Sequence, residues 1–172
     1  MRPNLPLLLL ALPLACGRAT TRPTAHDTSF AAVQARGAEV MGVDQYTSAH
    51  VFEDLPDGGR IVLDQPDTAD TAGIATIRAH MRVIARSFAR GTFDAPGLVH
   101  GRTVPGTAVM RERREHLSYA VNDRPRGAEL RIRTTDPEAL AAVRAFLAFQ
   151  RTDHRAAGHE SHGEHRINPP SP

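Results

Sequence analysis

The chain has no lysine, so all 21 of its Lys and Arg positions are arginine, and its net charge is only +2. A balance this close to neutral does not favour non-specific binding of nucleic acid, and we expect no nucleic-acid partner. The single cysteine excludes a disulfide within the chain. The folded part must therefore be stabilised by packing.

Long apolar runs are also absent. The run from Leu5 to Leu14 is too short to cross a bilayer as a permanent helix. It follows Arg2 and ends just before Ala15 and Cys16, which is the layout of a secretory signal. We therefore expect an exported protein.

Cys16 stands where a signal peptidase would cut. This placement resembles that in bacterial lipoproteins, in which the cysteine is lipidated and becomes the first mature residue. Gly17 and Arg18 follow in place of an aspartate, which by the same resemblance implies retention in the outer membrane, facing the periplasm. Pro13 departs from the motif, which usually has Leu there, so an ordinary signal peptide with a chance cysteine is the alternative.

These features predict four regions: a signal peptide over residues 1–15, a tether over 16–27, one domain over 28–155 and a disordered tail over 156–172. The tail carries His159, His162 and His165 at every third position. Such a tract binds divalent metal loosely without any fold, although unselected low-complexity sequence is equally plausible.

Common catalytic motifs are missing. The sequence has no G-x-S-x-G elbow, phosphate-binding loop or dinucleotide fingerprint, and Gly58-Gly59 fits a hairpin turn. Four aspartates fall at predicted turns and helix caps, where Asp has a structural role: Asp54, Asp57, Asp123 and Asp136. An enzyme of unidentified reaction is therefore only a third hypothesis, after two kinds of binding protein.

The sequence contains an internal repeat of one β-β-α unit, over about residues 40–90 and 109–154. A shift of 69 places aligns Asp54–Gly58 with Asp123–Gly127, and after three extra residues in the first copy Ala75–Met81 falls on Ala141–Leu147. Shared positions are most simply scaffold. Positions that differ between the copies are where a site could have been added.

The apolar pattern of both copies predicts strands followed by a helix. Strand positions that alternate toward a buried face are His50, Phe52, Ile61 and Leu63 in the first copy and Leu117, Tyr119, Val121, Leu130 and Ile132 in the second. The helix stripes are Ile74, Ile77, Met81, Ile84 and Phe88, then Leu140, Val143, Leu147, Gln150 and His154. Asp136 and Pro137 mark the start of the second helix.

We therefore predict an α+β fold in which the duplicated β-β-α unit gives a four-stranded antiparallel sheet with helices on one face. A further helix, over about residues 29–36, is expected to precede the sheet. The connector Gly91–Gly106 contains so many Gly and Pro residues that we expect it to be irregular, and loops of this length are often functional.

Three histidines occupy positions where the other copy has an aromatic ring. The pairs are His50 with Tyr119, His80 with Phe146, and His154 with Phe88. A half-buried imidazole needs a hydrogen bond or a metal ion, and desolvation favours the neutral form that binds metal. His100, in the long connector, is placed to close over such a site.

The sequence thus predicts a transition-metal site built from some of His50, His80, His100 and His154. Additional candidate ligands are Met41, Met110 and Asp153. Imidazole with thioether suits copper, and imidazole with carboxylate suits zinc. The alternative is that each histidine is an ordinary core or surface residue.

Charge differs between the copies. Residues 41–67 are acidic apart from Arg60, whereas residues 110–133 carry seven arginines. Opposite faces of this kind could pair two protomers or bind an envelope protein, which is the second hypothesis. A solvated surface without a partner is the alternative.

Three segments, Met41–His50, Val104–Met110 and Phe146–His154, resemble those of a family of small secreted bacterial lipoproteins. Some members of that family carry the name aspartate carbamoyltransferase. The present sequence lacks the Ser-Thr-Arg-Thr segment with which that enzyme binds carbamoyl phosphate. The resemblance therefore implies export and lipidation but no catalytic residue.

Overall fold

The structure is a computed structural model that describes residues 25–41 and 49–156, without the side chains of residues 25–28, 41 and 49. In chain order its elements are α1 (Ala25–Met41), β1 (Ala49–Leu55), β2 (Gly58–Asp64), α2 (Thr71–Ala89), α3 (Asp94–His100), α4 (Thr107–Glu112), a 3-10 turn (Arg114–His116), β3 (Leu117–Arg124), β4 (Gly127–Thr134) and α5 (Pro137–His154). The predicted signal peptide, Cys16, most of the tether and nearly all of the tail lie outside the described residues.

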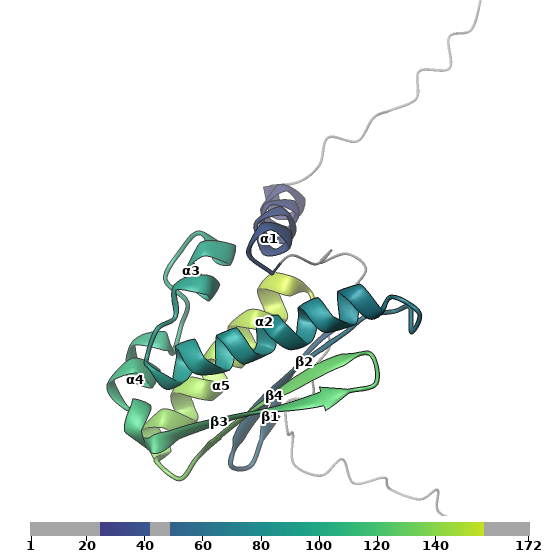
Figure 1. Cartoon of the computed structure of the whole chain (residues 1–172). Helices are drawn as coiled ribbons and strands as arrows, with labels where there is room; N and C mark the ends of the chain where they lie inside the picture. Colours follow the sequence, from purple (N-terminus) through teal and green to yellow (C-terminus); the bar gives the residue numbers. More distant parts are fainter. Residues whose placement is uncertain (1–24, 42–48, 157–172) are drawn as a thin grey trace, which may run out of the picture.

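The strands form one antiparallel sheet in the order β1-β2-β4-β3. Helices α2 and α5 lie across the same face of this sheet, with α1, α3 and α4 around them (Figure 1). Helix α2 packs mainly on β3 and β4, and α5 packs mainly on β1 and β2. The predicted α+β class, with a four-stranded sheet and a preceding helix, is confirmed.

The two hairpins have the same register once one is shifted by 69 residues. His50 lies opposite Leu63 in the first, and Tyr119 lies opposite Ile132 in the second. Because β2 and β4 also pair antiparallel to each other, an approximate two-fold axis passes between them. Positions that the shift relates therefore have similar places in the fold, whereas the duplication itself stays a prediction.

The core lies between the sheet and the two long helices. The predicted α2 stripe faces it, and so do Val143 and Leu147 of the α5 stripe, which have no exposed surface. Leu140 of the predicted α5 stripe is only half-buried, and Phe146 beside the stripe is buried instead. From the sheet, Leu130 and Ile132 are equally buried. The period-two and helical patterns of the sequence thus select the correct faces.

Both long helices begin at an aspartate cap. Asp136 accepts a hydrogen bond from the Ala139 amide at 2.8 Å, and Asp70 accepts one from the Gly73 amide at 2.9 Å. In the first copy the cap is Asp70 and not Asp67, which is the residue that aligns with Asp136. The three extra residues of this copy therefore lie between β2 and the cap of α2. Each cap satisfies an amide that has no partner within its helix.

The predicted irregular connector contains helix α3, so that expectation is wrong. Pro96 lies in the first turn of α3, where an amide is not needed, and Gly101 ends the helix with φ of 63°. The breakers therefore lie where a helix tolerates them. Helix α1 is also longer than predicted, because good helix formers such as alanine and glutamate extend beyond the part marked by Val33.

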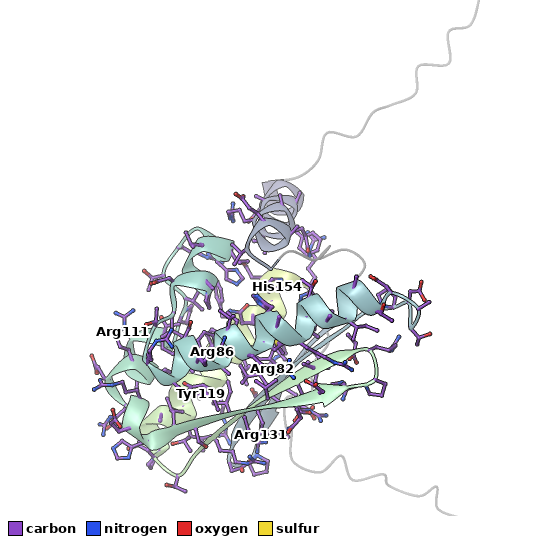
Figure 2. All side chains as sticks on the ribbon, in the orientation of Figure 1. Arg82, Arg86, Arg111, Tyr119, Arg131 and His154 are labelled. Carbon is purple, nitrogen blue, oxygen red and sulfur yellow. The ribbon has the colours of Figure 1, made fainter. Side chains whose placement is uncertain are left out.

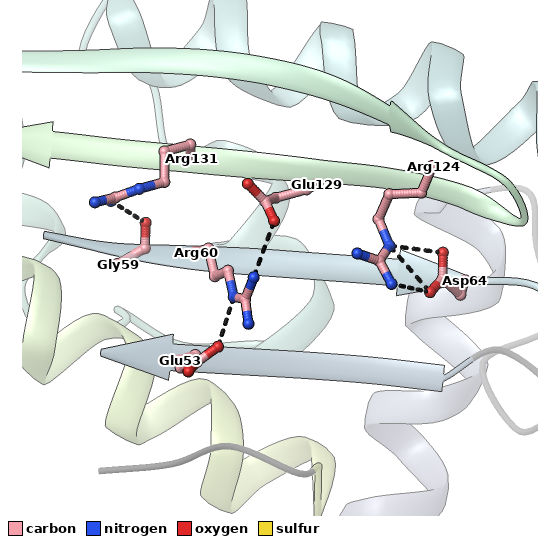
Figure 3. A network of polar contacts seen from close by, with 7 residues as sticks. All are labelled: Glu53, Gly59, Arg60, Asp64, Arg124, Glu129 and Arg131. Carbon is pink, nitrogen blue, oxygen red and sulfur yellow. Dashed lines mark hydrogen bonds and ion pairs between the residues drawn. The ribbon is translucent and has the colours of Figure 1, made fainter. Parts of the chain in front are cut away.

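The face of the sheet turned away from the helices carries a network of ion pairs (Figure 3). Arg60 contacts Glu53 at 2.5 Å and Glu129 at 3.3 Å, and Arg124 contacts Asp64 at 2.9 Å. The pair with Glu53 lies within the first hairpin, and the other two pairs join the first hairpin to the second. Part of the charge of the acidic and basic copies is therefore paired within the chain.

Candidate functional site

A small cavity of about 80 Å³ lies above β1 and β2, between α2 and α5. Helix α3 and Val40 of α1 complete its wall. Most of the wall is apolar, but it includes four imidazoles: His50, His80, His100 and His154. The four histidines predicted from the sequence therefore all line one cavity, although they lie on four different elements.

Each element presents its histidine for a simple reason. His50 lies two residues before the buried Phe52 on β1 and so shares its inward face. His80 precedes Met81 at the edge of the α2 stripe. His154 ends α5, and in the view of all side chains it lies behind α2, toward α1 (Figure 2).

The imidazole of His154 is at the centre of the cluster. Its ring centroid lies 5.5 Å from that of His50, with the planes 11° apart, and 5.0 Å from that of His100, with the planes 83° apart. Phe52 is stacked beside it at 5.6 Å. The Nδ1 atom of His154 is buried and has no hydrogen-bond partner among the described residues.

His100 is oriented by polar contacts. Its Nδ1 lies 2.5 Å from Oδ2 of Asp153, and its Nε2 lies 2.9 Å from Oε1 of Gln150. The other oxygen of Asp153 accepts a hydrogen bond from Arg102 at 2.7 Å. A carboxylate on one imidazole nitrogen is the arrangement that commonly fixes the ring of a metal-binding histidine.

Burial favours the neutral imidazole of two of these histidines, His154 and His80. Burial lowers the pKa of His154 to about 3, and the positive potential of His50 and His100 adds to this effect, whereas Asp153 opposes it. Burial also lowers the pKa of His80. Neutral imidazole is the form that donates a lone pair to a metal ion.

The other predicted ligands have different places. Asp153 contacts His100 and does not line the cavity. Met110 is fully buried in the core on α4 and does not line the cavity either, so the structure does not bring it to the histidines. The side chain of Met41 and all of Cys16 lie outside the described residues.

Sequence reasoning missed one donor. Met81, which is 3% exposed, lines the cavity beside His80. The sequence pattern places it in the helix stripe, where a methionine cannot be distinguished from a core leucine. The signal that could have found it is the repeat, because Met81 aligns with Leu147.

Within the part of the chain that the structure describes, no group of three or more His, Cys, Asp or Glu side chains is placed to hold a metal ion. Over the same residues, no helix is both long enough and apolar enough to cross a membrane. Comparisons of the chain with protein-family models, with curated proteins and with solved structures find no match. The resemblance to a lipoprotein family therefore stays a prediction.

Proposed function

We propose that this chain is a non-catalytic lipoprotein of the cell envelope whose histidine-lined cavity binds one transition-metal ion. The observation that carries the proposal is the buried cluster of His50, His100 and His154, in which the Nδ1 atom of His154 has no hydrogen-bond partner among the described residues. A buried polar atom without a partner costs free energy. A metal ion would supply the missing partner.

The spacing of the rings supports this reading. Two imidazoles that share a metal ion at about 2.0 Å from each nitrogen have ring centroids about 5–6 Å apart. The rings of His50 and His100 lie 5.5 and 5.0 Å from that of His154. Because His50 and His154 are stacked, their nitrogens do not converge, and binding requires the rings to rotate about their Cβ–Cγ bonds.

The contact between His100 and Asp153 is a second supporting feature. A carboxylate that accepts a hydrogen bond from Nδ1 increases the basicity of Nε2. Nε2 of His100 lies 2.9 Å from Oε1 of Gln150, which lines the same cavity. The amide of Gln150 must therefore move aside for His100 to bind a metal ion.

The second hypothesis, a scaffold that uses its acidic and basic hairpins, is less well supported. Arg60 and Arg124 already pair with Glu53, Glu129 and Asp64 on the open face of the sheet. Less charge is then left for a homodimer or an envelope partner. An association of either kind stays a prediction, as does attachment to the outer membrane through a lipid on Cys16.

The proposal is tested by metal uptake of the tag-free chain. The background protein carries Cys16→Ser, His159→Gln, His162→Gln and His165→Gln, so that a thiol and the tail histidines do not contribute. We expect about one equivalent of copper or zinc by elemental analysis after dialysis.

The informative variant is His154→Phe, which introduces the residue found at the related position 88. Uptake should be lost in this variant and kept in His116→Asn, an exposed histidine outside the cavity. Equal uptake by the His154 variant and its background, or no uptake by either, would refute the proposal.

A further inference from the structure

We propose that the ion bound in this cavity is monovalent copper, Cu(I), and that the thioether of Met81 is one of its ligands. The inference rests on the proposed metal-binding function and names its ion and a further ligand. It follows from three observations. They concern the donor residues that differ between the two halves of the fold, the charge of the cavity wall, and the kinds of ligand that line the cavity.

The first observation concerns positions related by the approximate two-fold axis. At four of them one half has a nitrogen or sulfur donor where the other has an aromatic or aliphatic side chain: His50 and Tyr119, His80 and Phe146, Met81 and Leu147, His154 and Phe88. All four donor-bearing residues line the same cavity. Among the related residues, Phe88 and Tyr119 form an ordinary edge-to-face aromatic pair at 5.9 Å, and Phe88 and Phe146 line the cavity as well.

Met81, which follows His80 on α2, also lines the cavity. Leu147 at the related position shows that an aliphatic side chain satisfies the packing there, since it is fully buried. A thioether is therefore not required by packing, whereas it is a preferred ligand of Cu(I).

The second observation is the absence of negative charge from the wall. Among the described residues that line the cavity there is no aspartate or glutamate. Asp153 is the nearest candidate, but its oxygens are held by His100 and Arg102. The cost of transferring an ion from water to an apolar site increases with the square of its charge. A neutral, mostly apolar site therefore favours a monovalent over a divalent cation.

The third observation is the kind of ligand. Zinc sites in proteins use nitrogen, thiolate or carboxylate ligands. The described residues that line the cavity include no thiolate and no carboxylate, but they include the thioether of Met81 together with the imidazoles. Cu(I) prefers soft ligands such as a thioether. The donor set thus matches Cu(I) better than Zn(II).

The experiment compares Met81→Leu with Met110→Leu in the full-length background described above. Met110 is the matched control, because it is a buried methionine that does not line the cavity. Leucine keeps nearly the same volume, so both variants should fold, and thermal melting of the metal-free proteins checks this. Cu(I) is added anaerobically with a reductant and a coloured competing chelator, and Zn(II) is titrated separately.

We expect Cu(I) to bind the background protein more tightly than Zn(II). Met81→Leu should weaken Cu(I) binding about tenfold or more, while Met110→Leu leaves it unchanged. The copper X-ray absorption spectrum should contain a sulfur neighbour that disappears only in Met81→Leu. Equal Cu(I) affinity in both variants, or preference for Zn(II), overturns this inference while metal binding stands. Uptake of neither ion overturns the proposed function itself.

Discussion

The ring of His154 stacks on that of His50 with the centroids 5.5 Å apart, at the corner of the sheet where the related residues would be two aromatic side chains. Phe88 and Tyr119, which are related to His154 and His50, show that these two positions pack well with aromatic rings. Replacing two such rings by imidazoles places polar atoms in an apolar environment. The cluster should therefore lower the stability of the metal-free protein in a way that depends on pH.

The first prediction concerns acid stability. The pKa of His154 falls from 6.5 to about 3 on folding, chiefly through burial and then through His50 and His100. Between these values the unfolded chain binds the extra proton and the folded chain does not. Stability of the metal-free protein should thus be complete above about pH 6.5 and fall toward pH 3, with a slope of up to about 1.4 kcal/mol per pH unit from this residue.

The measurement is urea denaturation in the presence of a chelator at a series of pH values. His154→Phe should be more stable than the parent throughout and should show a shallower dependence on pH between 4 and 6, in about the range set by these pKa values. His116→Asn, at an exposed site, is the control and should leave the slope unchanged. A slope that is the same in parent and His154→Phe would contradict the assignment.

A second prediction concerns the ion pair of Asp54 with Arg151. Their side chains are only 11% and 10% exposed, and Arg151 also donates to the carbonyl oxygen of Phe52 at 3.1 Å. Removing the arginine leaves a poorly solvated carboxylate, so Arg151→Met should destabilise the fold by about 3 kcal/mol.

The matched control is the pair that Arg82 forms with Asp123 at the end of the other hairpin. Its side chains are 47% and 45% exposed, and Arg82→Met should cost less than about 1 kcal/mol. Equal losses in chemical denaturation would show that burial does not distinguish the two pairs.

A third prediction concerns the pairing of β2 with β4, which connects the two hairpins. A Cβ atom on Gly127 would overlap the carbonyl oxygen of Leu63 across the β2–β4 pair, and a Cβ on Gly58 would overlap that of Ile132 in the same way. Gly127→Ala must separate the central strands and should cost more than about 2 kcal/mol.

Gly97 provides the opposite case. It lies within α3, and a Cβ there would meet nothing closer than a carbonyl oxygen at 3.9 Å. Gly97→Ala should raise stability by roughly 0.5–1 kcal/mol, because alanine loses less backbone freedom in a helix. Thermal unfolding of both variants checks the pair, and a tolerated Gly127→Ala would argue against the register described above.

Most of the fold could be predicted because the sequence alternates cleanly. Leu130 and Ile132 on β4 and the stripe through Ile77 on α2 mark their buried faces without reference to any other part of the chain. Helix α3 could not be found in this way. Pro96 and Gly101 favour a loop if composition alone is considered. They are compatible with a helix because they lie in its first turn and at its end.

The candidate site was predictable only where the repeat gave a comparison. His50, His80 and His154 stand out against Tyr or Phe, and the structure places all three on one cavity. Met81 aligns with Leu147, and core packing alone would allow this difference. The contact of His100 with Asp153 joins residues far apart in the sequence, and no local pattern indicates it.

The last prediction concerns Asp153 as a positioning residue for the proposed metal site. Its carboxylate lies 2.5 Å from Nδ1 of His100, so it orients the ring and increases the basicity of Nε2. Asp153→Asn keeps the shape of the side chain but removes the charge. Affinity for Cu(I) should fall about 10–100-fold, as expected for loss of a carboxylate behind a histidine ligand.

Arg102→Met separates this effect from a structural one. Arg102 pairs with the other oxygen of Asp153, but its side chain is 58% exposed and it does not line the cavity. It should therefore change Cu(I) affinity much less than Asp153→Asn does. Competition titrations give both affinities, and the melting temperatures of the metal-free proteins show whether either variant disturbs the fold. If the two variants lose affinity only in proportion to lost stability, Asp153 acts on the fold and not on His100.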